Sequence, residues 1–200
     1  MEQSLKFLYT RIKKPEYTRE QAESKVCQEI FIVKLGSSSY ANKKVAFKGG
    51  LIIDSLAHGE RGYTKDIDFD LIKYPLSSEG LNNFIDDLNK SNEFKNIVIK
   101  IEKEEDLRHK NYKGKRLTLS FNDGTNKFTL VTDVGVYLPL LKQNIVHNYE
   151  IAFGGTTQIL VNPVERIVAE KLSTFAIYGT DNERIKDLFD VYFFITKFIF

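Results

Sequence analysis

The chain has 200 residues, of which 42% are hydrophobic and 12% aromatic, and 29 Lys and Arg stand against 27 Asp and Glu. This length suffices for one domain with a sizeable core, and a net charge of only +2 argues against a protein whose whole surface binds nucleic acid. No stretch approaches the roughly 18 apolar residues of a membrane span, the N-terminus is too polar for a secretory signal, and the single Cys27 cannot form an intramolecular disulfide, so we expect a soluble, cytoplasmic protein.

The first 46 residues are predicted to be mainly helical. Thr18, followed by Gln21 three residues later, is typical of a capping box, and Pro15 separates this helix from a shorter one before it. Residues 45–47 form either a short strand or a turn. We interpret the whole region as a helical flank that covers the core.

A helix is then expected over residues 48–59, entered through Gly49 and Gly50 and ended by Gly59. Glycines at a helix start let the backbone approach a phosphate, and the exposed amides there attract anions. A glycine pair by itself is a weak indication of phosphate binding. The acidic segment that follows strengthens it.

That segment, D-I-D-F-D-L at residues 66–71, alternates acids with hydrophobic residues. Successive side chains of a strand point to opposite faces, so Asp66, Asp68 and Asp70 are expected on one face and the hydrophobic residues in the core. Three like charges on one face repel each other unless positive charge offsets them. Hard cations held by carboxylate oxygens are the simplest such charge, and a metal site is therefore predicted here.

Between residues 76 and 137 the pattern predicts a surface helix followed by a meander of strands. The predicted helix covers residues 76–94, and the predicted strands cover 97–101, 116–121 and 127–137. The charged run at 102–115 is predicted to be an exposed loop, with His109 in solvent. Asn122-Asp123-Gly124 is a strong signal for a hairpin turn.

The strand at 127–137 carries one carboxylate, Asp133, among mostly apolar neighbours. Burying a carboxylate is costly unless it is paired or bound to a metal. An edge-strand Asp that faces water is an equally good interpretation of this strand alone. Together with the D-I-D sequence, a third carboxylate at the metal site is the preferred interpretation.

Residues 149–153 and 158–161 are expected to form a further hairpin that leads into C-terminal helices. Asn162 as N-cap, Pro163 at the first helical position and Glu165 two residues later indicate the start of a helix that runs to about residue 177.

A last helix, from about residue 183, places Asp187 and Asp190 on one face, and Lys186 stands four residues before Asp190. Ion pairing on the helix surface is the plain interpretation of these residues. The apolar end at 195–200 indicates either a surface for a partner or a chain cut short of its natural end.

Four blocks occur in one order along residues 47–194: K-G-G before a helix, R-x-x-T-K-D-I-D-F-D-L, N-P-x-E-R-I-V-A-E-K-L and R-I-K-D-L-F-D-V-Y, with the lone strand Asp between the second and third. Together they resemble the AbiEii/AbiGii toxin family, minimal nucleotidyltransferases of the polymerase-β-like superfamily. The resemblance implies an α+β fold, a mixed β-sheet flanked by helices with added N- and C-terminal helical elements. We expect a core at 1–161, including the N-terminal flank, and a C-terminal helical region at 162–200.

The resemblance also implies transfer of a nucleotide from an NTP to an acceptor with Mg²⁺, two ions being expected when the NTP is bound. Asp66 and Asp68 match the metal-binding D-x-D pair, and Asp133 matches the third carboxylate, which helps the acceptor hydroxyl lose its proton. Lys171 matches a lysine that would neutralise triphosphate charge. Asp187 matches an acid that could orient this lysine or contact the nucleotide or acceptor.

The nucleotide-binding residues implied by the resemblance are Lys48, Gly49, Gly50, Arg61 and Thr64, in addition to Lys171. The glycine pair matches the turn that cradles the triphosphate, where other superfamily members often have Gly-Ser. This chain lacks that serine and so lacks one hydroxyl contact to phosphate.

The resemblance further implies that the chain is the toxin of a toxin–antitoxin or abortive-infection system with a cognate antitoxin. RNA, such as the 3′ end of tRNA, is the favoured acceptor, and a protein acceptor is the second choice. A basic patch around residues 100–115, with Arg108, Lys110, Lys113 and Arg116, could steer an RNA, although a solvated loop is the preferred interpretation of this stretch.

A non-catalytic nucleotide sensor or partner-binding protein on the same fold is the alternative from a different class. A metal-dependent phosphohydrolase is disfavoured, because such sites use more His ligands than the scattered His58, His109 and His147 offer.

Overall fold

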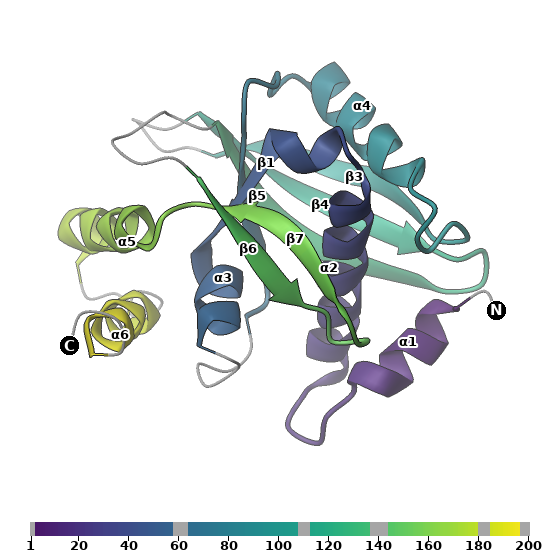
Figure 1. Ribbon diagram of the computed structural model, residues 1–200, viewed down its shortest axis with the longest axis horizontal. Helices are drawn as coiled ribbons and strands as arrows, with labels where there is room; N and C mark the ends of the chain where they lie inside the picture. The colour runs from purple at the N-terminus through teal and green to yellow at the C-terminus, as the bar shows by residue number, and fades with distance from the viewer. Residues whose placement is uncertain (1–2, 58–63, 108–112, 137–143, 180–184, 197–200) are drawn as a thin grey trace.

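The computed structural model describes residues 3–57, 64–107, 113–136, 144–179 and 185–196. Within these residues, seven strands form one sheet in the order β3-β4-β5-β2-β1-β7-β6 (Figure 1). The strands are β1 (Val45–Lys48), β2 (Ile67–Leu71), β3 (Val98–Asp106), β4 (Gly114–Asn122), β5 (Lys127–Val136), β6 (Ile145–Glu150) and β7 (Thr156–Val161).

The sheet is mixed. β2 pairs in parallel with β5 and β1 pairs in parallel with β7, whereas the other neighbouring strands are antiparallel. The predicted α+β class with a mixed sheet flanked by helices is therefore confirmed. β2, which carries the acidic segment, and β1, which ends at Lys48 just before the glycine pair, are both central strands.

Six helices accompany the sheet in the part of the chain described: α1 (Leu5–Ile12), α2 (Arg19–Ser37), α3 (Gly49–Leu56), α4 (Ser78–Asn89), α5 (Val164–Tyr178) and α6 (Ile185–Phe194), with a 3-10 turn, η1 (Ala41–Lys44). The predicted capping box of Thr18 and Gln21 is present at the start of α2. In Figure 1, α5 and α6 lie together at one side of the sheet, away from α1, α2 and α4. None of the described helices is both long and apolar enough to span a bilayer.

The core lies between the sheet and α2 with α4. Phe31 of α2, Phe47 of β1, Phe69 of β2 and Phe84 of α4 form a contiguous aromatic cluster with ring centroids 5.6 to 6.4 Å apart. Ile67 and Leu71 are buried beside Phe69, as the alternation predicts. Because the hydrophobic residues of β2 face this core, its acids point to the opposite face of the sheet.

The charged run was wrongly expected to be a loop from residue 102. β3 continues to Asp106 and pairs with β4 from Val98 to Asp106, with a register shift between Ile101 and Lys103. β3 is an edge strand, where charged side chains remain in solvent. Cross-strand partners also offset these charges, since Glu102 accepts from Ser120 at 2.6 Å and pairs with Lys127 at 2.9 Å.

Other predicted elements exist but have different ends. The helix predicted at 76–94 is the shorter α4, with Ser77 as its N-cap. The C-terminal hairpin uses 145–150 as its first strand rather than 149–153, because Gly154 and Gly155, both at positive φ, make the turn before β7.

Candidate active site

Four charged residues occupy one row across the sheet. Lys48 of β1 is the register partner of Asp68 on β2, Asp68 is the partner of Asp133 on β5, and Asp133 is the partner of Arg116 on β4. Register partners present their side chains on the same face of a sheet. The row therefore places two carboxylates side by side in the middle, with one cation at each end.

Asp68 is the electrostatically perturbed member of the row. Burial raises its pKa from 3.8 to about 7, and the negative charges of Asp133 and Asp66 act in the same direction, against the opposing effect of Lys48 and Lys171. A divalent cation would stabilise the charged form. Carboxylate oxygens are the ligands that Mg²⁺ prefers, so the chemistry of this donor set fits such an ion.

Asp133 is held by an arginine. Nε and Nη2 of Arg116 donate to its two carboxylate oxygens at 2.7 and 2.8 Å, and this bond raises the pKa of the guanidinium further. Among the residues described, no three His, Cys, Asp or Glu side chains converge as metal ligands. Asp66 is exposed just before β2. Sequence reasoning placed Arg116 only near a basic stretch and missed its contact with Asp133.

Gly49 begins α3 against Asp68. Its φ is +70°, and a Cβ on this residue would overlap Oδ2 of Asp68 and lie 3.0 Å from Cγ. A glycine is thus required for both backbone and space. Gly50 follows in the first turn, so the predicted helix entry through the glycine pair is confirmed. The predicted end at residue 59 is wrong, because α3 ends at Leu56 with Ala57 as its C-cap. Gly59 and Arg61 lie outside the described residues.

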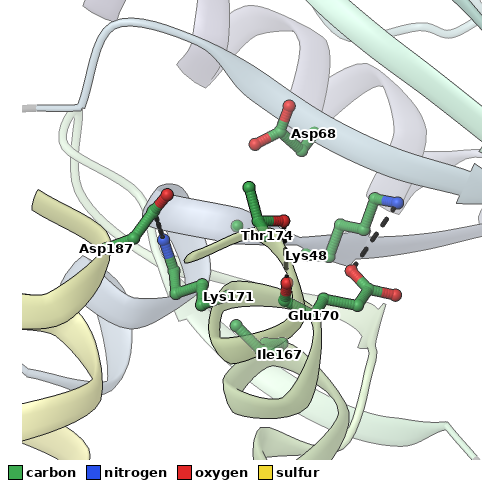
Figure 2. A pocket seen from close by; sticks show the side chains of 8 residues that line it. Lys48, Asp68, Ile167, Glu170, Lys171, Thr174 and Asp187 are labelled. Carbon is green, nitrogen blue, oxygen red and sulfur yellow. Dashed lines mark hydrogen bonds and ion pairs between the residues drawn. The ribbon is translucent and has the colours of Figure 1, made fainter. Parts of the chain in front are cut away.

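A pocket of about 160 Å³ lies beside this row (Figure 2). Lys48, Gly49 and Asp68 line it from the sheet side, and the opposite wall comes from α5 and α6, which contribute Ile167, Lys171 and Asp187 among others. The pocket therefore brings the K-G-G and D-I-D segments together with the two C-terminal helices.

Lys171 reaches from α5 to α6. Its Nζ lies 2.6 Å from Oδ1 of Asp187 and 2.8 Å from Oδ2 of Asp190, and Asp190 is almost fully buried. The predicted contact between Asp187 and Lys171 is present (Figure 2). Both acids therefore pair across to α5, whereas the side chain of Lys186, their expected neighbour on α6, lies outside the described part of the chain. Their shared helix face was predicted from the three-residue spacing, but the second partner of Lys171 was missed.

Asp70, the last acid of β2, is fully buried. Its partners are protein groups: Lys48 at 2.8 Å, Arg166 at 3.0 Å and the side-chain amide of Asn162 at 3.1 Å. The expectation that Asn162 caps α5 is wrong, because its side chain donates to Asp70 and Pro163 occupies the cap position without a side-chain bond. The role of Arg166 was missed, since it depends on which strand α5 lies against.

Helix α2 holds the segment that enters β2. Nε2 of Gln28 donates to the carbonyl oxygens of Thr64 and Lys65 at 2.9 Å each, and Oγ of Ser24 donates to that of Lys65 at 2.8 Å. Thr64 was expected to bind nucleotide, and it stands two residues before Asp66. The N-terminal flank thus does more than cover the core.

One of the three histidines, His147, lies in the described part of the chain. His147 lies 2.9 Å from the hydroxyl of Ser55, and neither lines the pocket. His58 and His109 fall outside the described residues, as do Arg108 and Lys110 of the basic stretch.

Comparison with known proteins gives one family and one fold. The family model described as "Nucleotidyl transferase AbiEii toxin, Type IV TA system" matches residues 35–200. A proposed nucleotidyltransferase from H. pylori superposes with a TM-score of 0.55 at 16% identity, over 91% of this chain and 71% of that one. JHP933 from Helicobacter pylori superposes with a TM-score of 0.51 at 18% identity, over 91% and 68% of the two chains. A search of curated proteins found no significant match.

Proposed function

Because this chain belongs to the AbiEii nucleotidyltransferase toxin family, we propose that it transfers a nucleoside monophosphate from an NTP to an acceptor, and that RNA, such as the 3′ end of tRNA, is this acceptor. The observation that carries the proposal is the side-by-side placement of Asp68 and Asp133 at a pocket that Lys171 of α5 also lines. Its biological setting is a toxin–antitoxin pair, with a cognate antitoxin as partner.

Asp66, Asp68 and Asp133 are the residues that would hold Mg²⁺. When bound, the metal supplies charge neutralisation at the triphosphate and makes a hydroxyl easier to deprotonate. The raised pKa of Asp68 supports this role, because burial and the neighbouring charge of Asp133 disfavour its bare carboxylate and so favour a bound cation.

The chain's own residues supply binding and proton transfer. The amides at the start of α3, at Gly49 and Gly50, would bind triphosphate oxygens, since helix N-termini favour anions and Gly49 lines the pocket. Lys171 adds a positive charge for the leaving pyrophosphate, and Asp187 orients its Nζ. A carboxylate oxygen of Asp133 accepts the proton of the attacking hydroxyl, which then forms the new bond to the α-phosphorus as pyrophosphate leaves. Arg61 and Thr64 complete the nucleotide contacts.

The test is an incubation with Mg²⁺, each α-labelled NTP in turn, and total RNA plus cell lysate, with Asp68→Asn as the control. Label in a tRNA-sized band, absent from the control, is the expected result and also identifies the base. Label in a protein band would keep the chemistry and replace the acceptor by a protein. NTP binding without any labelled product would overturn the enzyme proposal in favour of a nucleotide sensor, an alternative consistent with the ion pairs that engage Asp133 and Lys171.

A further inference from the structure

Four charged side chains form a closed ring of alternating sign at the pocket, and two of them, Lys48 and Glu170, line it. Lys48 Nζ lies 2.8 Å from Oδ1 of Asp70, Nη2 of Arg166 lies 3.0 Å from Oδ2 of Asp70, and Nε of Arg166 lies 3.0 Å from Oε1 of Glu170. The ring closes where Oε2 of Glu170 lies 3.9 Å from Lys48 Nζ, the contact drawn in Figure 2. We call Lys48, Asp70, Arg166 and Glu170 the ionic ring.

The ionic ring is mostly withdrawn from solvent. The side chain of Asp70 is 0% exposed, that of Arg166 8% and that of Lys48 12%, whereas Glu170 is 41% exposed and forms the outer edge. Buried charges of this kind depend on good geometry and on each other, because loss of one partner leaves another charge uncompensated in a poorly solvated place. The four side chains are therefore held at defined positions.

Three ring members adjoin residues of the candidate site. Lys48 precedes Gly49, Glu170 precedes Lys171, and Asp70 is two residues after Asp68 on the same face of β2. The ring thus connects the phosphate-side turn, the acidic strand and the helix that carries Lys171.

Helix α5 has few other attachments to the sheet. It packs principally against α6, and both lie at one side of the sheet in Figure 1. Ile167 belongs to the hydrophobic core, Val164 and Val168 are partly buried against it, and Leu172 and Ile177 are exposed. The ionic ring therefore adds charged contacts with β1 and β2 to this small apolar attachment of α5.

We propose that the ionic ring is a positioning site that sets the distance between α5 and β2, so that Asp70 and Arg166 determine the affinity for the NTP triphosphate without touching it. The inference rests on the proposed function, since it assumes that the triphosphate lies between Asp68 and Lys171. Neither Asp70 nor Arg166 is a metal ligand or a catalytic residue in this assignment.

Charge and position can be separated by a pair of variants of opposite sign. Asp70→Asn adds net positive charge near the pocket, and Arg166→Met adds net negative charge. If the ionic ring acted only through its electrostatic field, Asp70→Asn would strengthen the binding of the triphosphate and Arg166→Met would weaken it. Positioning predicts that both variants weaken it, and that the charge-neutral double variant D70N/R166M does so too, with the NTP dissociation constant rising about tenfold or more.

Binding of ATP, CTP, GTP and UTP to each variant is measured by calorimetry. The distance from α5 to the sheet is measured independently with spin labels at Ile177→Cys and Thr129→Cys, both exposed, while the native Cys27 is buried and stays unlabelled. We expect a broader or shifted distance distribution in D70N/R166M. Glu102→Gln, which removes an exposed carboxylate from the Lys127 pair on the same sheet, is the control and should change neither quantity.

Opposite effects of the two single variants, or a double variant that matches the wild type in both affinity and distance distribution, would overturn the positioning proposal. Wild-type protein that binds no NTP overturns the proposed function instead. In that case the spin-label distances alone test whether the ionic ring positions α5. An unchanged distance distribution in D70N/R166M would refute that claim.

Discussion

Asp68 on β2 and Asp133 on β5 are direct register partners on two parallel strands, so their carboxylates lie on the same face of the sheet. Two neighbouring carboxylates repel each other unless positive charge lies nearby, and the two residues differ in how far their charge is neutralised. Asp133 receives both donors of Arg116. Asp68 lies in the pocket wall, where burial and the charge of Asp133 raise its pKa to about 7.

The stability of the metal-free protein should therefore fall as pH rises. The folded-state pKa of Asp68 exceeds its ordinary value of 3.8, so the native state binds more protons than the unfolded state between these values and becomes less favoured as pH rises from about 4 to 8. The shift corresponds to at most about 4 kcal/mol in the free energy of unfolding. Urea denaturation in EDTA at several pH values measures it.

Asp68→Asn is the matched variant for this pH dependence, because it keeps the shape and removes the titrating group. Its free energy of unfolding should vary less with pH than that of the wild type over this range. Mg²⁺ should also raise the melting temperature of the wild type more at pH 8 than at pH 6, and of Asp68→Asn at neither pH. Parallel pH profiles for the two proteins would contradict the assignment.

Gly49→Ala should abolish NTP binding and destabilise the fold. A Cβ at this position is strained at φ +70° and also collides with the Asp68 carboxylate. Gly124→Ala is a control with comparable backbone strain, since Gly124 has φ +89° and no atom within 4 Å of its Cβ position. We expect a loss of about 1 kcal/mol for Gly124→Ala and a clearly larger loss for Gly49→Ala in thermal or urea unfolding. Equal losses with NTP binding intact would rule out the close approach.

Arg116→Gln should strengthen the binding of divalent cations. The guanidinium neutralises Asp133 in the metal-free protein and so competes with a cation for the same oxygens. The pair is half-exposed and contributes about 1 kcal/mol at most, which corresponds to about fivefold in the dissociation constant. Titration with Mn²⁺ or Mg²⁺ by calorimetry at pH 8 tests it. Arg19→Gln, which breaks an exposed pair with Glu23 on α2, should leave cation affinity unchanged, and weaker binding in Arg116→Gln would mean that the arginine orients Asp133 for the metal.

Local sequence patterns were sufficient for much of the site. The alternation in residues 66–71 determines which side chains of β2 face the core, and the Thr18–Gln21 spacing gives the start of α2. The same alternation places Asp133 on the opposite face from Leu130 and Val134. These features depend only on the period of a strand or on bonds within one turn of helix, and neighbouring residues encode both.

The features that escaped prediction depend on tertiary pairing. Residues 102–106 contain few strand-forming signals, yet pairing with β4 makes them a strand. Asn162 is a residue type that favours the N-cap, but its amide donates instead to the buried carboxylate of Asp70. The contact of Arg116 with Asp133 requires the register of β4 on β5, which no local pattern specifies.

Lys171→Met is expected to lower stability as well as activity. A loss of activity in this variant alone therefore does not show that Lys171 contacts the nucleotide. Lys171 offsets the charge of Asp187 and of Asp190, whose side chain is only 1% exposed, and removal of one member of such a buried pair costs about 3 kcal/mol or more. Urea unfolding should show this loss. The double variant K171M/D190N, in which the buried acid is also neutralised, should recover much of the stability but no NTP binding, because the cation for the triphosphate is still missing. Recovery of NTP binding together with stability would show that Lys171 serves only to join α5 to α6.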